Sequence, residues 1–262
     1  MCGVPFHSAE SYIAKLVAKG YKVAICEQLE DPKLAKGLVK RDVIRVITPG
    51  TVVENSMLDE TRNNFLCSIC YEEDGLGLCF GDISTGDLTA DQVLAPNSET
   101  LLHILEDRLA RYSPSEIVLN PQALDLTGLA DFIRDKLHAA VECQESALYQ
   151  DLGQCQARVS RQFGGQSLAQ LELSDKPLAV KALSALFDYL SRTQITGLER
   201  MNEVDIGTDA GVMGLDINAR RNLELTETLR NKEKRGSLLW VLDRTKTAMG
   251  KRLIKPGWSS PF

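Results

Sequence analysis

The strongest constraint on the fold is a group of closely spaced strand signals in residues 65–89. Three β-type runs are predicted there, at 65–71, 76–83 and 87–89. The turn sequences Asp74-Gly75 and Ser84-Thr85-Gly86 separate these runs, and turns of this kind join neighbouring antiparallel strands. The sequence therefore predicts an antiparallel meander near the middle of the chain.

Two amphipathic helices are predicted after the meander, with a fourth strand at 116–119 between them. Their apolar faces consist of Leu101, Leu102, Leu105 and Leu109 in the first helix and Leu129, Phe132, Ile133 and Leu137 in the second. Three strands, helix, strand, helix is the element order of the ribonuclease H-like fold. We therefore expect an α/β domain of this kind at 60–150, reaching at most to about residue 172.

Residues 1–51 predict only part of a small α/β domain. Ser8 is expected to cap a helix that ends at Gly20, and strands are expected at 21–26 and 43–47. The apolar face of this helix consists of Tyr12, Ile13, Leu16 and Val17. One helix and two strands leave a sheet edge exposed and enclose little core. We therefore expect the beginning of this domain to lie outside the chain.

Strand signals largely disappear after Gln154, so residues 173–262 are expected to be the incomplete start of a helical domain. A long helix should have Pro177 in its first turn. Asp216 is expected to cap a helix that runs to about Arg235, and Ser237 to cap another at 238–242.

The end of the chain departs from this helical pattern. Pro256 and Gly257 break a helix, and nothing in the residues after them predicts packing on a neighbour. We therefore expect a disordered tail at 256–262 and an interrupted reading frame.

The formal net charge of -6 conceals two basic segments. From Arg220 to Lys255 eleven Lys or Arg stand against four acids, a local +7, while residues 1–219 carry -13. Residues 32–46 carry a local +4. The cations of this second segment are Lys33, Lys36, Lys40, Arg41 and Arg45. Such a cluster can contact nucleic-acid phosphates, although a solvated loop face explains it equally well.

Seven scattered cysteines, an odd number, do not resemble the disulfide framework of a small secreted domain, so reduced thiols are expected. No apolar run approaches the roughly 18 residues of a membrane span, and the first residues lack a secretory signal pattern. We expect a cytoplasmic protein that does not enter a membrane.

Cys67 and Cys70 form a Cys-x-x-Cys pair, which in other contexts holds zinc or cycles as a dithiol. On a strand, residues three apart point to opposite faces, so we expect both thiols to pack in the core. His7, His103 and His138 share no ligand spacing. The sequence predicts no metal site.

Asp82 and Glu116 are the acids that a ribonuclease H-like nuclease could use to hold Mg²⁺. The first predicted strand, 65–71, contains no acid, so a scaffold is favoured over a nuclease.

Gly250-Lys251 matches part of a phosphate-binding loop, but Thr245 replaces its first glycine and Arg252 its hydroxyl residue. We therefore expect no catalytic residue and no bound cofactor in this chain, and no binding or hydrolysis of ATP.

Several strings, in order along the chain, resemble the MutS family of DNA mismatch-recognition proteins. Those similar to the second half of its mismatch-binding domain are Gly3-Val-Pro-Phe-His7, Val23-Ala-Ile-Cys-Glu-Gln28, Asp31-Pro32, Lys36-Gly37 and Arg45-Val-Ile-Thr-Pro-Gly-Thr51. Asp82-Ile-Ser-Thr-Gly86 is similar to a string of its connector domain. Strings similar to the start of its core and lever domain are Leu215-Asp216, Arg221-Asn-Leu-Glu-Leu225, Gly236-Ser-Leu-Leu239, Leu242-Asp-Arg-Thr245 and Met249-Gly250.

The resemblance implies DNA mismatch repair by three domains. These are an incomplete mismatch-binding α/β domain at 1–51, a ribonuclease H-like connector at 60–150 and the start of a helical core and lever domain at 173–262. Among the motif positions, Gly3, Pro5, His7, Asn222 and Gly250 are expected to be structural. Lys36, Lys40, Arg41 and Arg45 are the expected DNA-backbone contacts.

The whole family protein, by the same resemblance, is a homodimer that encircles mismatched double-stranded DNA, uses ATP and Mg²⁺, and signals to MutL. Its aromatic wedge belongs to a Phe-x-Glu motif, which residues 1–51 do not contain. The wedge, clamp and ATPase domains are expected outside this chain, which should therefore bind rather than catalyse.

DNA binding by this chain is expected to be weak and indifferent to mismatches, with a slope of log affinity against log salt of about -3. Two other functions remain open, a metal-dependent nuclease and a protein-interaction module that docks MutL.

Overall fold

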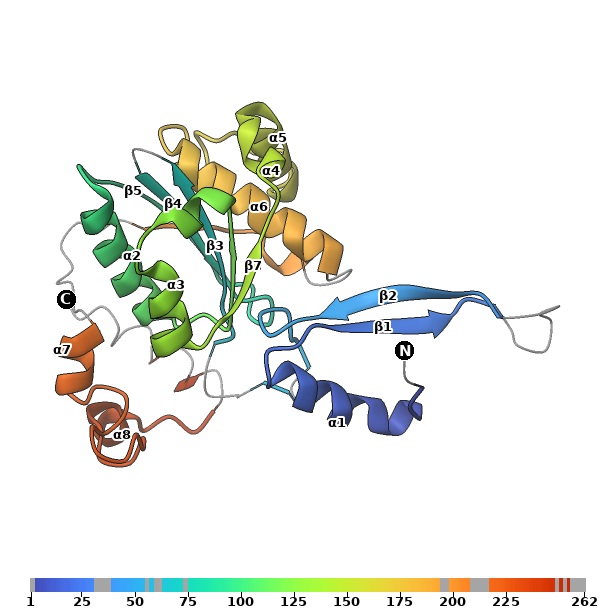
Figure 1. Cartoon of the computed structure of the whole chain (residues 1–262), viewed down its shortest axis with the longest axis horizontal. Helices are drawn as coiled ribbons and strands as arrows, with labels where there is room; N and C mark the ends of the chain where they lie inside the picture. The colour runs from blue at the N-terminus through green and yellow to red at the C-terminus, as the bar shows by residue number, and fades with distance from the viewer. Residues whose placement is uncertain are drawn as a thin grey trace.

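The computed structural model describes residues 3–30, 39–54, 57–58, 63–72, 75–193, 198–207, 217–247, 250–251 and 254. The predicted features that lie outside this part are those at Asp31, Lys33, Lys36, Asp74, Asp216, Met249, Arg252 and 256–262. A sheet with helices on both faces forms the main body, and a two-stranded hairpin projects from it (Figure 1). The architecture is mixed α/β, as predicted.

Six strands form the central sheet. They are β3 (Leu66–Glu72), β4 (Gly75–Gly81), β5 (Leu88–Leu94), β6 (Glu116–Leu119), β7 (Ala140–Cys143) and β8 (Asp205–Ile206). Their order is β7-β6-β3-β4-β5-β8. β3, β4 and β5 are antiparallel, whereas β6, β7 and β8 each run parallel to a neighbour. The predicted meander and the fourth strand at 116–119 are confirmed.

The third strand extends to Leu94, beyond the predicted 87–89. Its second half was not predicted, because polar side chains there obscure the strand pattern. Asp91 forms an ion pair with Arg108, and Gln92 Oε1 accepts a hydrogen bond from the Leu178 amide. β7 and β8 were not predicted. They have only four and two residues and lie at the two edges of the sheet, so their hydrophobic pattern is weak.

One face of the sheet is covered by α2 (Ser98–Tyr112) and α3 (Leu129–Phe132). A 3-10 helix, η1 (Pro121–Asp125), precedes α3, and a π-helical turn, η2 (Ile133–Leu137), follows it. Asn97 caps α2, its side chain accepting from the Thr100 amide at 2.8 Å. The predicted apolar faces of both helices are confirmed, with Leu102 and Leu137 only partly buried.

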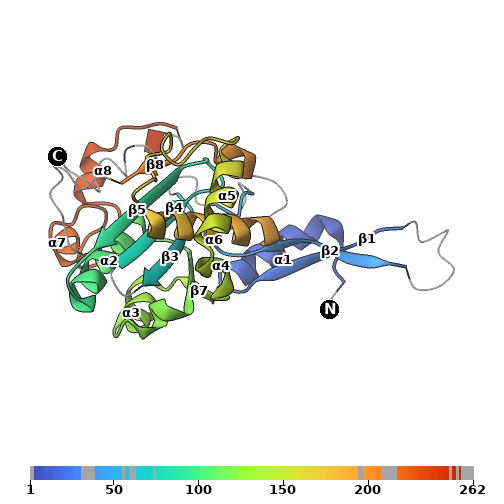
Figure 2. The ribbon, with the colours of Figure 1, turned by 90° about the horizontal axis from the view of Figure 1, so that it is seen from above.

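The other face is covered by α6 (Pro177–Thr193), with α4 (Ala147–Gln150) and α5 (Leu152–Gln162) beside it (Figure 2). The predicted long helix with Pro177 in its first turn is confirmed. Its expected place in a separate helical segment is wrong, because it packs on the meander. Gly77 on β4 permits this approach, since a Cβ there would lie 1.9 Å from the Leu178 carbonyl oxygen. An apolar stripe predicts that a helix face is buried but does not identify its partner.

The N-terminal unit consists of α1 (Phe6–Val17) and the antiparallel strands β1 (Val23–Gln28) and β2 (Arg41–Ile47). Ser8 is not the helix cap, which is Pro5. The Ser8 hydroxyl instead donates to the Pro5 carbonyl from inside the helix. The buried residues of its small core are Val17, Ile47 and Val52, and Tyr12 and Leu16 of the predicted stripe remain exposed.

The C-terminal described segment contains η3 (Leu198–Arg200), α7 (Ile217–Asn222) and α8 (Leu238–Leu242). Ser237 caps α8 as predicted, accepting from the Trp240 amide at 3.2 Å. The helix predicted to reach Arg235 ends at Asn222, since Glu224 and Lys232 adopt positive φ angles that helices exclude. None of the helices in the described ranges is long and apolar enough to span a bilayer.

Candidate nucleic-acid interface

The β1–β2 hairpin projects from the body of the molecule, far beyond the sheet and its helices (Figures 1 and 2). Its base pairs Val23 with Ile47, and its outermost pair is Gln28 with Arg41. A register shift between Ile25 and Cys26 interrupts the pairing. Such irregularities increase the local twist of a two-stranded ribbon. The side chains of its outer half, 26–28 and 41–43, are all exposed, so the hairpin presents this half to solvent on both faces.

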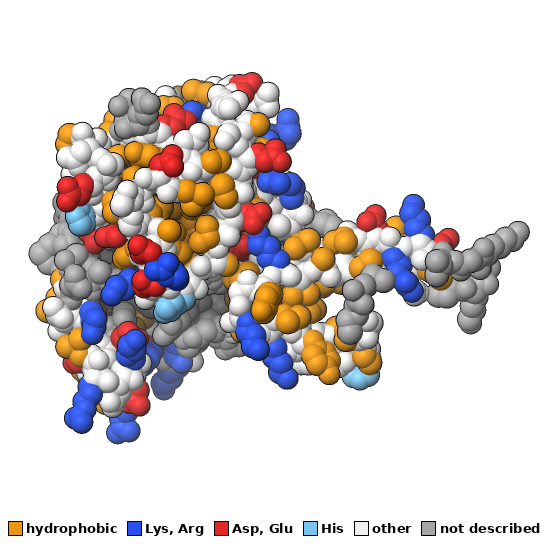
Figure 3. Space-filling model, in the orientation of Figure 1, with side chains coloured by type: hydrophobic (Ala, Val, Ile, Leu, Met, Phe, Trp, Pro, Cys, Tyr) orange, Lys and Arg blue, Asp and Glu red, His pale blue; other side chains and the backbone are white. Residues whose placement is uncertain are grey.

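Lys40 and Arg41 lie at the outer end of this hairpin and are exposed. The Lys40 amide donates to the Glu30 carboxylate at 2.6 Å, which ties the two strands together beyond their last pair. In the space-filling view, Lys and Arg side chains on the outer part of the hairpin are interspersed with Asp and Glu side chains (Figure 3). Two of the four predicted backbone contacts are thus available to a ligand. Lys36 lies outside the described residues.

Arg45 has a different environment from Lys40 and Arg41. Its guanidinium forms a two-point ion pair with the Glu54 carboxylate, with Nη2 3.3 Å from Oε2. Its side chain is only 21% exposed. A phosphate could reach Arg45 only by competing with Glu54, so we expect Arg45 to hold the segment after β2 against the hairpin.

The base of the hairpin rests on Glu116, the first residue of β6, whose side chain is fully buried. Its carboxylate accepts hydrogen bonds from the Thr48 hydroxyl, from the Gly50 amide at 3.0 Å and from the Tyr189 hydroxyl at 2.6 Å. The ammonium of Lys22 lies 3.8 Å from the same carboxylate. These partners were not predicted, because in the sequence Glu116 stood out only as a possible metal ligand. An acid in an otherwise apolar strand was the signal that partners must exist.

Asp82, the other acid of the hypothetical nuclease site, is also engaged in hydrogen bonds. Its carboxylate accepts from the Asn64 amide at 2.9 Å and from the Ser84 amide and hydroxyl at 2.8 and 2.6 Å. Across the residues that the structure describes, no three His, Cys, Asp or Glu side chains are placed to hold a metal ion. The carboxylates of Asp82 and Glu116 are thus both engaged in hydrogen bonds within the protein.

Cys67 and Cys70 lie on opposite faces of the sheet, as predicted. Cys67 packs with the α2 side of the core and Cys70 with the α6 side, and both are buried. Burial raises the pKa of the Cys67 thiol well above its usual value and that of Cys70 to about 12. Neither arrangement supports a shared metal or a disulfide between them.

Alkylation of the folded protein should modify Cys26 and Cys143, which are exposed, long before Cys67 and Cys70. At neutral pH, well below its pKa of about 12, Cys70 holds about a thousandth of the thiolate of an ordinary cysteine, and thiolate is the reactive form. Peptide mapping after timed iodoacetamide treatment measures the four rates. Equal rates at Cys67 and Cys26 would contradict the buried placement, and a urea-unfolded sample provides the control.

Gly250 and Lys251 do not form part of a phosphate cradle. The Gly250 amide donates to the Thr247 hydroxyl and the Lys251 amide to the Thr247 carbonyl, both at 3.1 Å. These amides are used within the chain and do not converge on an empty space.

The remaining motif positions lie at exposed points. Gly3 precedes α1 with no atom within 4 Å of an added Cβ, Pro5 occupies the N-cap position, and His7 is in the first turn. Asn222 is the last residue of α7. Gly3, Pro5 and His7 thus share the start of α1, whereas Asn222 lies at the end of another helix, α7.

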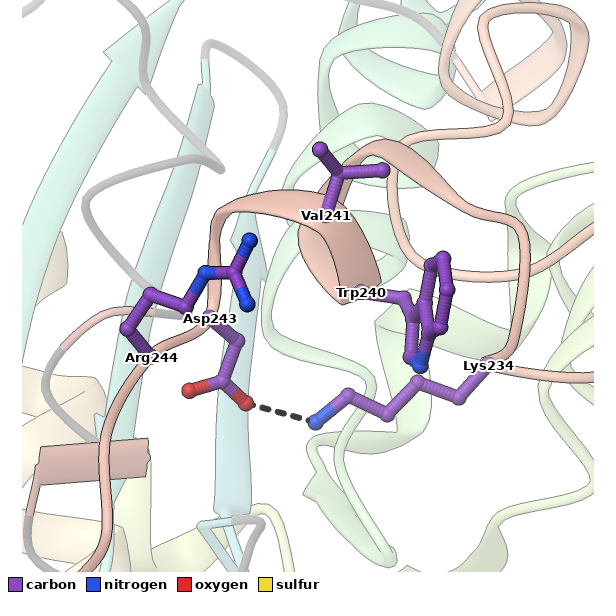
Figure 4. A pocket seen from close by; sticks show the side chains of 5 residues that line it. All are labelled: Lys234, Trp240, Val241, Asp243 and Arg244. Atoms are coloured by element: carbon purple, nitrogen blue, oxygen red, sulfur yellow. Dashed lines mark hydrogen bonds and ion pairs between the residues drawn. The ribbon is translucent and has the colours of Figure 1, made fainter.

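The C-terminal segment carries exposed cations around a shallow pocket beside α8. Lys234, Trp240, Val241, Asp243 and Arg244 line it, and Lys234 Nζ lies 2.7 Å from Asp243 Oδ2 (Figure 4). Hydrogen bonds from Lys234 and Thr245 lower the pKa of Asp243 to about 2. Arg230, Lys232 and Lys246 are also exposed in this segment.

Family models match three consecutive parts of the chain. MutS domain I matches residues 1–56, MutS domain II residues 64–203 and MutS domain III residues 218–262. The second match includes α6 together with the strands β3 to β7, and β8 lies just beyond its end.

Curated relatives are similar over the whole chain. DNA mismatch repair protein MutS of Lachnoclostridium phytofermentans is 46% identical over 262 residues, which are 100% of this chain and 27% of that protein. The protein of the same name from Caldanaerobacter subterraneus subsp. tengcongensis is 44% identical, again over 100% of this chain and 29% of its own length. That of Alkaliphilus oremlandii is 42% identical over 100% of this chain and 30% of its own length. The chain spans 27–30% of the length of these relatives.

Proposed function

The chain belongs to the MutS family of DNA mismatch repair proteins, and we propose on that premise that its N-terminal hairpin contacts the phosphate backbone of duplex DNA. The observation that carries this proposal is the pair of exposed cations, Lys40 and Arg41, on a hairpin that projects from the body. Cationic side chains neutralise phosphates and supply most of the sequence-independent affinity for DNA. In this proposal Lys36 adds a third contact, and Arg45 positions the strand.

The central domain serves in this proposal as a ribonuclease H-like connector without nuclease activity. The strand order supports this assignment, because β3, the first strand of the meander, lies between β4 and β6. The hydrogen bonds that occupy Asp82 and Glu116 support a scaffold role. We extend this domain from residue 63 to residue 207, because α6 and β8 complete the sheet. Residues 1–51 and 217–262 then belong to the mismatch-binding domain and to the core and lever domain.

For the whole protein we extend the proposal to mismatched double-stranded DNA and MutL as partners, a homodimer, ATP with Mg²⁺ as cofactors, and a cytoplasmic location. The resemblance to the family supports these roles. Gly3, Pro5, His7, Asn222 and Gly250 are structural positions in this proposal. No catalytic step is assigned to residues of this chain.

Replacing both exposed cations, Lys40→Ala with Arg41→Ala, should flatten the salt dependence of DNA binding. Each lost phosphate contact changes the slope of log affinity against log salt by about 0.9, so the double variant should change it by about 2. Anisotropy of a labelled duplex, titrated from about 50 to about 200 mM salt, measures the slope. Matched and G·T duplexes should bind the unmodified chain equally.

The matched control is Lys15→Ala with Lys19→Ala, which removes the same charge from exposed positions on and after α1. We expect a slope close to that of the unmodified chain. If both double variants change the slope equally, the effect comes from net charge and not from the hairpin, and the proposed contact is wrong.

A further inference from the structure

Glu116 is a buried carboxylate that the proposed DNA contact does not itself require. Its side chain has no exposed surface. Oε2 accepts from the Thr48 hydroxyl and, at 3.0 Å, from the Gly50 amide, while Oε1 accepts from the Tyr189 hydroxyl at 2.6 Å. Burying a charge is costly unless hydrogen bonds and counter-charges offset it. The site is therefore built around the carboxylate.

The hairpin groups that contact Glu116 come from the ends of both strands at the hairpin base. Lys22 immediately precedes β1 and Thr48 immediately follows β2, and the intervening pair Val23 with Ile47 closes the hairpin base. Lys22 Nζ lies 3.8 Å from Glu116 Oε1. Figure 1 shows this base lying against one end of the central sheet. The Glu116 side chain thus contacts the residue before β1 and the residue after β2.

The turn after β2 is held tightly against the carboxylate. A Cβ on Gly50 would lie 2.9 Å from the Glu116 Cβ and 3.1 Å from the Leu66 Cδ1, so only glycine fits without movement. The turn is closed by the Thr51 hydroxyl, which accepts from the Thr48 amide at 2.9 Å. All of these groups are buried. The direction in which the chain enters the turn is consequently fixed by the position of Glu116.

Tyr189 completes the site from α6. Burial and the neighbouring Glu116 raise the pKa of the Tyr189 hydroxyl, so it stays protonated and donates to the carboxylate. The ammonium of Lys22 lies 5.3 Å from the centre of the Tyr189 ring and 2.6 Å from Glu142 on β7. The Lys22 and Glu142 side chains are 34% and 43% exposed, so water weakens their ion pair. Glu116 therefore makes the buried hydrogen bonds between the hairpin base and the central sheet.

We propose that Glu116 is a positioning residue that fixes the angle at which the hairpin leaves the connector sheet. The part of this inference that concerns DNA binding rests on the proposed function. The six steps from Ile47 to Arg41 extend about 20 Å, so a tilt of about 10° at the base would move Arg41 by about 3 Å. That displacement is comparable with the length of a hydrogen bond to a phosphate oxygen. A fixed hairpin base therefore keeps Lys40 and Arg41 in position to contact phosphates.

The first test compares Glu116→Gln with Glu142→Gln by hydrogen exchange of the purified full chain. Glu116→Gln keeps the side-chain size and removes the charge that accepts three hydrogen bonds. The amides of Thr48, Gly50 and Thr51 at the hairpin base should exchange about tenfold faster, because the Gly50 amide loses its charged acceptor and the turn that bonds Thr48 to Thr51 is no longer anchored. Sheet amides of β3 and β6 should keep their rates. Glu142→Gln should change neither set.

Tyr189→Phe is the second variant, in case Glu116→Gln fails to fold. It removes one donor to the carboxylate and retains the ring, and it should accelerate exchange at 48–51 to a smaller degree. The inference is overturned if sheet and hairpin-base amides accelerate together, since Glu116 would then be only a core residue. It is equally overturned if neither set changes, or if Glu142→Gln loosens the base as much.

DNA binding separates this inference from the proposed function. Glu116→Gln should lower the affinity for a labelled duplex while the salt slope keeps its value, because a loosened hairpin still makes both phosphate contacts when bound but adopts that angle less often when free. Lys40→Ala with Arg41→Ala should instead reduce the slope. If the unmodified chain does not bind DNA, the proposed contact fails, and hydrogen exchange still decides the role of Glu116.

Discussion

A chain that ends at residue 172 should not form the central sheet, whereas one that ends at residue 207 should. The shorter chain lacks α6, whose largest buried apolar side chains are Leu183, Leu186, Phe187 and Leu190. Burying each such side chain contributes about 1.5–3 kcal/mol, so these four contribute about 6–12 kcal/mol. That sum is comparable with the total stability of a domain, about 5–15 kcal/mol. Removing α6 would also expose Cys70, Cys79 and Val118 on the sheet.

Near-ultraviolet circular dichroism and thermal unfolding of the two chains measure this difference. The chain ending at 207 keeps both α6 and β8 and should unfold cooperatively. The shorter chain should lack a near-ultraviolet signal and bind a hydrophobic dye. Cooperative unfolding of the shorter chain would mean that the α2 face alone stabilises the sheet, as the predicted domain at 60–150 requires.

Local features were predicted well, because they depend on neighbours in sequence. The two-residue period of a strand was enough to place Cys67 and Cys70 on opposite faces of the sheet. The cap at Ser237 depends on an amide only three residues away. Ser8 is the exception, since Pro5 begins the helix first and leaves the Ser8 hydroxyl to bond inside it.

Features that depend on distant partners could not be predicted. The sequence of α6 specifies an apolar face, but its partner is a strand almost one hundred residues earlier, where Gly77 leaves room for the helix backbone. Glu116 meets Thr48 and Tyr189, which are 68 and 73 residues away. Composition identified the basic hairpin, but only the contacts distinguish exposed Lys40 and Arg41 from paired Arg45.

Gly77→Ala should be among the most damaging single substitutions in the described part of the chain. The new Cβ would lie 1.9 Å from the Leu178 carbonyl oxygen and 2.2 Å from its carbonyl carbon. Both are backbone atoms, so no side-chain rotation relieves the contact. The start of α6 cannot shift freely, because the Leu178 amide donates to Gln92 Oε1 at 2.8 Å. Overpacking of this kind costs about 3 kcal/mol or more.

Thermal unfolding measures this effect, and the expected fall of the midpoint is about 6–12 °C for a protein of this size. Gly81→Ala on the same strand is the matched control. Its added Cβ would meet Met201 Cε at 2.9 Å, the flexible end of a side chain that can move. Gly3→Ala, with open space around it, should leave the midpoint unchanged. Equal midpoints for Gly77→Ala and Gly81→Ala would mean that α6 does not approach β4 through its backbone, and the close contact between helix and strand would be wrong.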